Sequence, residues 1–289
     1  MKIKLGVHIS ISGSLSNSID RALNSGCSAF QIFTRSPRQW KTREISIEES
    51  DRFKEKLKNT SIGFDSVVVH MPYLPNLSAP DSKMYQQSLK VLEDEIVRCG
   101  ILQIPNLVIH LGSHLGHGSE NGICQLINAC NTALNNYLDS NTLEKNDVKI
   151  LLENSAGQKN SIGSSFEEIK SILDRLNSNN FGVCLDTCHA FAAGYDLSTE
   201  KGSLQVLDAL SDIIGIDKIK VIHLNDSKGE LGSKLDRHYH IGIGKMGNEG
   251  FKVLLNNKKI SHIPFIMETP IDDIRSDKDN IAYVQDLIR

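Results

Sequence analysis

The sequence predicts an α/β protein folded as a single (β/α)8 TIM barrel, and two patterns predict that fold class. Eight short apolar runs rich in Val, Ile and Phe alternate with longer segments whose apolar residues have helical spacing. The 289 residues allow about 36 for each strand and helix pair, which is the usual size of that unit in a closed parallel barrel. A doubly wound open sheet is the alternative architecture.

The predicted strands are short and almost wholly apolar, as expected for strands covered on both faces. They lie at residues 5–9, 29–34, 66–70, 106–110, 149–154, 181–186, 220–225 and 264–269. The predicted helices lie at 14–25, 48–57, 82–99, 123–137, 166–176 and 204–213, and a weaker, polar candidate lies at 248–258. No linker or low-complexity segment interrupts this alternation, so we expect residues 1–289 to form one domain.

The composition limits the classes of protein to consider. A hydrophobic content of 39% supports a substantial core. The formal charge of −3 gives no overall basic signature, so binding of nucleic acid would require a local cationic surface around the mouth of the barrel. The candidates for that surface are Arg35, Arg38, Lys41, Arg43, Lys228, Lys234, Arg237 and Lys245.

Cysteine usage and the absence of long apolar runs indicate a cellular compartment. The six cysteines form no CxxC pair, which is typical of reduced thiols in a cytosolic protein. No run approaches about 18 consecutive apolar residues, and the apolar run at the N-terminus is too short for a signal peptide. We therefore expect a cytoplasmic protein with no membrane partner.

A residue able to bind a metal ion ends six successive predicted strands. These residues are His70, His110, Glu153, Asp186, His223 and Glu268. Because the carboxyl ends of barrel strands meet at one mouth, we expect the six side chains to point into a common site. Three more residues, His189, Asp236 and His238, follow the sixth and seventh strands and are expected to join them.

Nine such residues around one cavity would be costly without cations, because buried charges would be left unpaired. Nine ligands exceed the needs of one ion, so two or three ions are implied. Imidazole mixed with carboxylate, without thiolate, favours Zn²⁺, with Mn²⁺ or Fe²⁺ as alternatives. A centre of this kind suits the hydrolysis of phosphate esters.

Four motifs carry a resemblance to a known family. They are HLGSH at 110–114, GVCLDTCHAFAAGYD at 182–196, HLNDSKGELGSKLDRHYHIGIGKMG at 223–247 and MET at 267–269. Through them the chain resembles the endonuclease IV family of apurinic/apyrimidinic (AP) endonucleases, from Gly6 to Thr269. The resemblance implies a zinc-dependent DNA-repair enzyme that hydrolyses the phosphodiester 5′ to an abasic site in double-stranded DNA. The expected products are a 3′-hydroxyl and a 5′-deoxyribose phosphate, and cleaning of blocked 3′ ends is also expected.

The resemblance further implies three zinc ions and a role for each of the nine residues. The first ion would be held by His70, His110 and Glu153, the second by Glu153, Asp186, His223 and Glu268, and the third by His189, Asp236 and His238. Glu153 would bridge two ions. Glu153, Asp186 and Glu268 are therefore the residues expected to act in catalysis.

For the DNA, the resemblance indicates residues that wedge into the duplex where the abasic nucleotide swings out. They are Arg38 in the PRQW segment and Tyr73 with Leu74 in the HMPYLPNL segment. The simplest expectation is a monomer that engages a bent duplex.

Other residues near the predicted mouth have weaker signals. His8 and His114 are candidates for orienting the ligand side chains. His240 could face the phosphate backbone. Trp40, the single tryptophan, is expected to anchor its loop.

Two alternatives to the nuclease remain at this point. A sugar isomerase or epimerase of the xylose isomerase type would share the barrel and a centre of carboxylates and histidines. It would leave His189, Asp236 and His238 without a role. A non-catalytic barrel that binds damaged DNA would be expected to lack some of the ligands, and none is missing.

Overall fold

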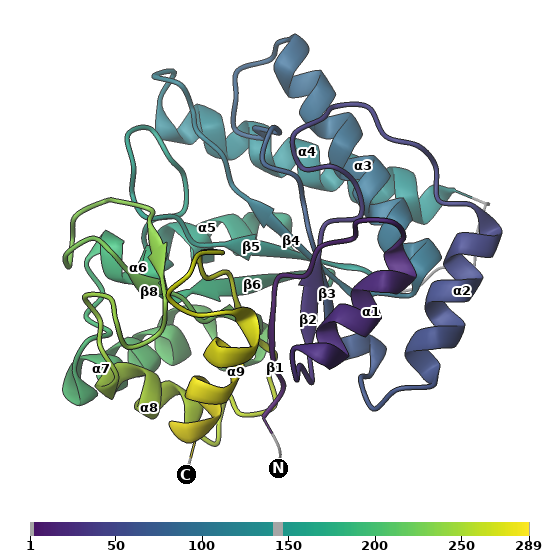
Figure 1. The fold of residues 1–289 in the computed structure, drawn as a ribbon. Helices are drawn as coiled ribbons and strands as arrows, with labels where there is room; N and C mark the ends of the chain where they lie inside the picture. Colours follow the sequence, from purple (N-terminus) through teal and green to yellow (C-terminus); the bar gives the residue numbers. More distant parts are fainter. Residues whose placement is uncertain (1–2, 141–146, 289) are drawn as a thin grey trace.

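A computed structural model describes residues 3–140 and 147–288, in which eight parallel strands form a nearly closed barrel (Figure 1). The strands are β1 (Leu5–Val7), β2 (Phe30–Ile32), β3 (Val67–His70), β4 (Asn106–His110), β5 (Lys149–Glu153), β6 (Phe181–Asp186), β7 (Ile219–His223) and β10 (Phe265–Met267). Their order is β1-β10-β7-β6-β5-β4-β3-β2, so strands adjacent in sequence are adjacent in space. This confirms the barrel, since a doubly wound sheet would reverse its strand order.

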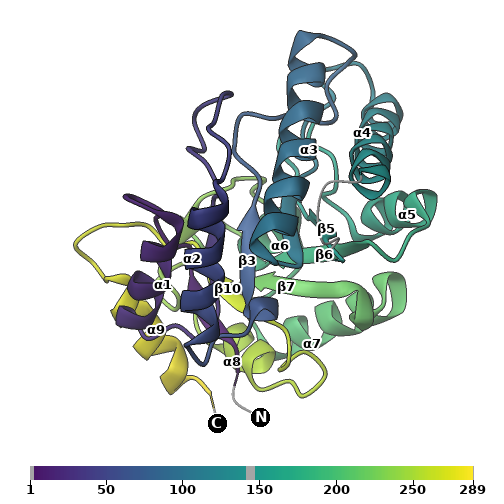
Figure 2. The same ribbon diagram turned by 90° about the vertical axis from the view of Figure 1, so that its right-hand side faces the viewer.

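Helices cover the outside of the strands. They are α1 (Leu15–Asn24), α2 (Ile47–Lys58), α3 (Lys83–Leu102), α4 (Ser119–Asp139), α5 (Phe166–Leu176), α6 (Thr187–Ala193), α7 (Glu200–Ala209), α8 (Glu249–Leu255) and α9 (Asp277–Asp286). Figure 2 shows α3, α4 and α5 on one side of the strands and α1, α2 and α9 on the other. Serine side chains cap the starts of several helices, for example Ser46 before α2 and Ser165 before α5.

The sequence predicts most of these elements to within a few residues, but it does not predict helices α6 and α9 or a small hairpin. Helix α6 has seven residues and begins directly after β6, so it is too short to show helical periodicity and its sequence predicts a turn. Helix α9 buries only Asn280, Ile281 and Val284, which is too few apolar residues for a periodic signal. The antiparallel hairpin of β8 (Asp226–Ser227) and β9 (His238–Tyr239) has two residues in each strand.

Two separate cores stabilise the barrel. The interior is filled by one fully buried residue from each of seven strands or their edges: Ala29, Val68, Val108, Leu151, Cys184, Val221 and Ile266. A larger core between strands and helices contains Phe30, Phe53, Phe166 and Phe251, and Trp40 packs against it as expected for a loop anchor. All six cysteines are free thiols, and five of them are buried.

The barrel closes between β1 and β2 through a short, close backbone contact, in which the N–H groups of Ser28 and Ala29 also donate to the Leu5 carbonyl. His8 and Gln31 form a single parallel bridge, and the Ile9 N–H donates to the Gln31 carbonyl at 2.7 Å. Gly6 permits this approach, because a Cβ at that position would lie 1.7 Å from the carbonyl oxygen of Ala29. The backbone of β1 is therefore pressed against its neighbour at the seam.

We expect Gly6→Ala to lower the free energy of unfolding by about 2 kcal/mol or more, because the added methyl group collides with rigid backbone. The control is Gly232→Ala, where a Cβ meets nothing within 4 Å but φ is +71°, so only a backbone cost of about 1 kcal/mol applies. Urea denaturation of both variants measures the difference. Equal losses of stability would mean that the seam is not tightly packed.

Within the described residues, we find no helix that combines the length and the apolar character needed to cross a membrane.

Candidate metal centre

The alternation of side chains along each strand places one polar residue per strand at the mouth. Each interior core residue is followed, two positions later, by a residue on the same face of its strand, closer to the carboxyl end. Together with His8, two residues after Gly6, these form what we call the mouth ring: His8, Gln31, His70, His110, Glu153, Asp186, His223 and Glu268. The register agrees, since His110 lies opposite Glu153 and Asp186 opposite His223. Six of the eight are the residues predicted from the strand ends.

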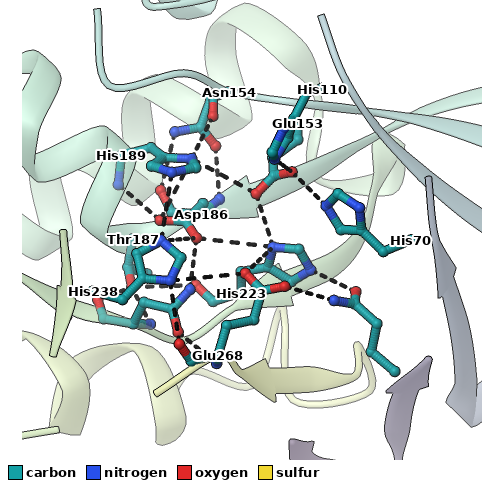
Figure 3. Close-up of polar contacts among 12 residues, drawn as sticks. His70, His110, Glu153, Asn154, Asp186, Thr187, His189, His223, His238 and Glu268 are labelled. Atoms are coloured by element: carbon teal, nitrogen blue, oxygen red, sulfur yellow. Dashed lines mark hydrogen bonds and ion pairs between the residues drawn. The ribbon is translucent and has the colours of Figure 1, made fainter. Parts of the chain in front are cut away.

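The first group of potential ligands gathers around one oxygen of Glu153 (Figure 3). The Nε2 atoms of His70 and of His110 each lie 3.1 Å from Glu153 Oε2. Glu153 and His70 are buried, while the His110 side chain is 43% exposed at the mouth. The group is therefore open on one side only.

The second group gathers around His223 and shares Glu153 with the first. Nδ1 of His223 lies 2.9 Å from Glu153 Oε1, 3.4 Å from Glu268 Oε2 and 3.8 Å from Asp186 Oδ2. One potential ligand atom from each of these four residues lies within 4.8 Å of all the others. A single imidazole nitrogen thus faces three carboxylates.

The third group combines helix α6 with the β8–β9 hairpin. Asp186 accepts from the His189 N–H at 2.7 Å as the N-cap of α6, which orients His189 back toward the strand ends. His189 Nε2 lies 3.2 Å from Asp236 Oδ1, and His238 Nε2 lies 3.5 Å from the same oxygen. The hairpin therefore carries two of the nine predicted residues to a helix that carries a third.

Several imidazoles use one ring nitrogen for the protein and turn the other toward the carboxylates. Nδ1 of His70 donates to the Met71 carbonyl at 2.7 Å, and Nδ1 of His189 donates to the Asn154 carbonyl at 2.9 Å. In both residues Nε2 is left to face the cluster. Ligating histidines are held in this way in metalloproteins, because the outer hydrogen bond fixes the tautomer.

The carboxylates and imidazoles strongly shift one another's pKa. Burial would raise the pKa of Glu153, but the nearby His223 and His110 hold it well below the usual range. Burial would lower the pKa of His189, but Asp186 and Asp236 outweigh it and raise the value to about 10. The cluster therefore pairs carboxylates with the protonated imidazole of His189, whose charge a divalent cation can replace.

These observations show that the residues fit divalent cations. Each of the three groups presents imidazole nitrogens and carboxylate oxygens within 4.8 Å of one another, on side chains that are mostly buried. Mixed nitrogen and oxygen donors suit Zn²⁺ and its neighbours in the first transition series.

The residues predicted to contact DNA lie around the same opening. Arg38 is exposed on the loop after β2, while Tyr73 and Leu74 are 57% and 37% exposed on the loop after β3. Partial burial raises the pKa of Tyr73, the carboxylates of Glu268 and Glu153 raise it further, and Arg38 opposes them. Arg38 and the cluster are thus both within electrostatic reach of Tyr73.

A cavity of about 260 Å³ opens beside the first and third groups. Its lining includes Tyr73, His110, Glu153, Asn154, His189 and Asp236. The predicted wedge residue Tyr73 and the predicted ligands therefore share one concave surface.

Three expectations about individual residues need correction. Arg35 does not belong to the cationic surface, since its side chain is 1% exposed and pairs with Glu95 and Asp94. His240 does not face outward: it is buried, with Nε2 2.9 Å from Asp272 Oδ1. His114 accepts from the N–H groups of Gly116 and Gly118, so it shapes its own loop instead of orienting a ligand.

His8, in contrast, does contact the centre, since its Nδ1 lies 3.8 Å from Glu268 Oε1.

The sequence did not indicate the amide side chains that support the candidate ligands. The Asn154 side chain donates to the Asp186 carbonyl and accepts from the Asp186 N–H. The Asn225 side chain donates to Asp186 Oδ2 at 2.7 Å. Both follow closely after a strand end, which is a usable signal. Gln31 is a third such residue and lies inside a predicted strand.

Comparisons with known proteins indicate the family to which the chain belongs. A sequence model described as a xylose isomerase-like TIM barrel matches residues 19–289. The probable endonuclease 4 of Cenarchaeum symbiosum is 49% identical over 286 residues, which cover 99% of both chains. The chain belongs to the endonuclease IV family. A second member, the probable endonuclease 4 of Nitrosopumilus maritimus, is 48% identical over 98% of this chain and 99% of its own. The crystal structure of endonuclease IV from Thermus thermophilus superposes with a TM-score of 0.84 at 32% identity and 98% coverage of both chains.

Proposed function

We propose that this endonuclease IV family member is a metal-dependent AP endonuclease of DNA repair. It would hydrolyse the phosphodiester 5′ to an abasic site and leave a 3′-hydroxyl and a 5′-deoxyribose phosphate. The observation that carries the proposal is the convergence of nine imidazole and carboxylate side chains in three groups at one barrel mouth. The full-length similarity to proteins named endonuclease 4 supports it.

In this proposal three Zn²⁺ ions occupy the three groups, with Mn²⁺ or Fe²⁺ as alternatives. His70, His110 and Glu153 hold the first, and His189, Asp236 and His238 hold the third. The second is held by Glu153, Asp186, His223 and Glu268. When bound, such ions supply the Lewis acidity that activates water and neutralises charge on a phosphate.

The chain's own residues position the substrate and set its direction of approach. Glu153 belongs to two groups, so its two oxygens fix the spacing between them. The side chains of His110 and Asp236 are 43% and 41% exposed, whereas Asp186 and His223 are fully buried. A phosphate therefore reaches the centre from the side of His110 and Asp236. No side chain is needed as a nucleophile.

The loops around the mouth suit a flipped nucleotide. Arg38, Tyr73 and Leu74 are exposed beside the centre and would fill the space left by the abasic nucleotide. Swinging out a nucleotide without a base costs least, because no pairing or stacking is lost on that strand. We further propose that the enzyme acts as a single-domain monomer on double-stranded DNA.

The sugar isomerase or epimerase remains the second candidate, because the matching family description covers xylose isomerase-like barrels. The third group favours the nuclease over it. A metal centre for a sugar would use the residues of the strand ends, while His189, Asp236 and His238 add a further complete ligand set. A third cation held by these residues would suit the negative charge and the size of a phosphodiester.

The test uses a duplex with a single tetrahydrofuran abasic analogue and resolves the ends of the products. The analogue cannot undergo β-elimination, so a nick that leaves a 3′-hydroxyl shows hydrolysis. An undamaged duplex of the same sequence is the control. Failure of metal-replete protein to nick the analogue, together with interconversion of a ketose and an aldose, would favour the isomerase.

Binding of zinc should release protons from the clusters. A protonated imidazole must lose the proton on its ligating nitrogen before it can bind a metal, and near pH 8 the His189 ring is still doubly protonated because Asp186 and Asp236 raise its pKa to about 10 despite burial. Zinc affinity should therefore rise with pH. Calorimetric titration in two buffers of different ionisation enthalpy measures the release, and an identical heat in both would contradict the proposal.

A further inference from the structure

Two members of the mouth ring, His8 and Gln31, are not among the nine predicted metal ligands. Gln31 is fully buried and lies two residues after Ala29, so it faces the interior at the same level as the six ligands. Unlike an isolated polar residue, it has a partner for both ends of its carboxamide. Both principal partners belong to the second group of ligands.

The contacts of the Gln31 side chain are short and specific. Its Oε1 lies 2.8 Å from Nε2 of His223, and its Nε2 donates to Glu268 Oε1 at 2.7 Å. The same Nε2 lies 3.0 Å from Nδ1 of His8. An amide oxygen can only accept, so the His223 nitrogen facing it carries a proton.

This arrangement decides which atom of His223 is available. With Nε2 protonated and bonded to Gln31, a neutral ring presents its lone pair at Nδ1, which faces Glu153, Glu268 and Asp186 at 2.9, 3.4 and 3.8 Å. The other end of the amide holds Glu268 Oε1, which leaves Oε2 turned toward the same Nδ1. One side chain from β2 thereby orients ligands from β7 and β10.

We propose that Gln31 is a positioning residue of the second group, which selects the His223 tautomer and orients Glu268 for the metal ion held there. The inference rests on the proposed metal-dependent function. It assigns to Gln31 an effect on one ion of the three, because its hydrogen bonds reach the second group and not the third. Partners of this kind typically change metal affinity by about 10–100-fold.

The test compares Gln31→Met with the wild type, since methionine keeps the length of the side chain and removes both hydrogen bonds. Zinc-loaded proteins are challenged with increasing chelator, and retained zinc is counted. We expect Gln31→Met to lose one ion at a chelator concentration about 10–100-fold lower than the wild type, with the other ions unaffected. Gln205→Met, on the exposed face of α7, is the matched control and should retain zinc like the wild type.

Equal retention by Gln31→Met and the wild type would overturn the inference alone and would mean that Gln31 only fills space. Absence of zinc from the wild type would overturn the proposed function with it. A second measurement needs no variant: nitrogen-15 spectra of histidine-labelled, zinc-loaded wild-type protein. A proton on Nε2 of His223 supports the inference, and a proton on Nδ1 contradicts it.

Discussion

Glu153→Gln is expected to slow cleavage of abasic DNA by about 1000-fold or more while leaving the affinity for that DNA nearly unchanged. Glu153 Oε2 lies 3.1 Å from both His70 and His110, and Oε1 lies 2.9 Å from His223. The amide removes the negative charge and turns one of these acceptors into a donor. Two groups of candidate ligands therefore lose their shared carboxylate at once.

DNA affinity should survive because it depends on other residues. We expect contacts to phosphates to come from loops around the mouth, because electrostatic attraction to the backbone dominates affinity for DNA. Single-turnover cleavage and equilibrium binding to a tetrahydrofuran duplex separate the two effects. The control is Glu55→Gln on the exposed face of α2, which should change neither. Parallel loss of binding and cleavage would mean that Glu153 mainly holds the fold.

The largest effect on stability is expected for Glu95→Ala, which should lower the free energy of unfolding by about 3–5 kcal/mol. Glu95 is completely buried in α3, where it accepts from Thr34 at 2.6 Å and pairs with the buried guanidinium of Arg35. Arg98 donates to the side chain and the carbonyl of Thr34 and to the carbonyl of Arg43. Removal of the carboxylate leaves two buried guanidinium groups without the charge that they share.

Urea denaturation of Glu95→Ala measures this cost. The control is the exposed Glu55→Ala, whose free energy of unfolding should lie within about 0.5 kcal/mol of the wild type.

The network of Glu95, Arg35 and Arg98 ties both ends of the irregular loop between Thr34 and Arg43, which carries Arg38. Cleavage should therefore weaken under conditions where the variant is still folded. A change in stability as small as that of the control would show that the network is not needed.

The convergence of the candidate ligands at the mouth was predictable because their signal is local. Each of the six at strand ends follows an apolar run, and the period of two along a strand then decides that they share one face. His189 and Asp186 are separated by one helical turn, which brings them together whatever the rest of the fold does. These relations can be read from the sequence before the barrel is known.

The supporting residues depend on contacts between distant segments. Gln31 lies within a predicted strand, and its role follows only from the tertiary packing that places it beside His223 and Glu268, 192 and 237 positions further along the chain. Arg35 lies in a polar segment of the sequence that is typical of a surface loop. It is buried because it pairs with Glu95, 60 positions away. A sequence pattern reports the type of a residue, whereas its partner is fixed by tertiary packing.

The central claim is that a metal centre at the barrel mouth hydrolyses abasic DNA, and stepwise metal replacement tests it most directly. Protein stripped by a strong chelator is titrated with zinc while nicking of a tetrahydrofuran duplex is followed. We predict no nicking by the stripped protein and full recovery at about three equivalents, one for each group of ligands. Nicking by fully stripped protein, with a 3′-hydroxyl product, would contradict the claim.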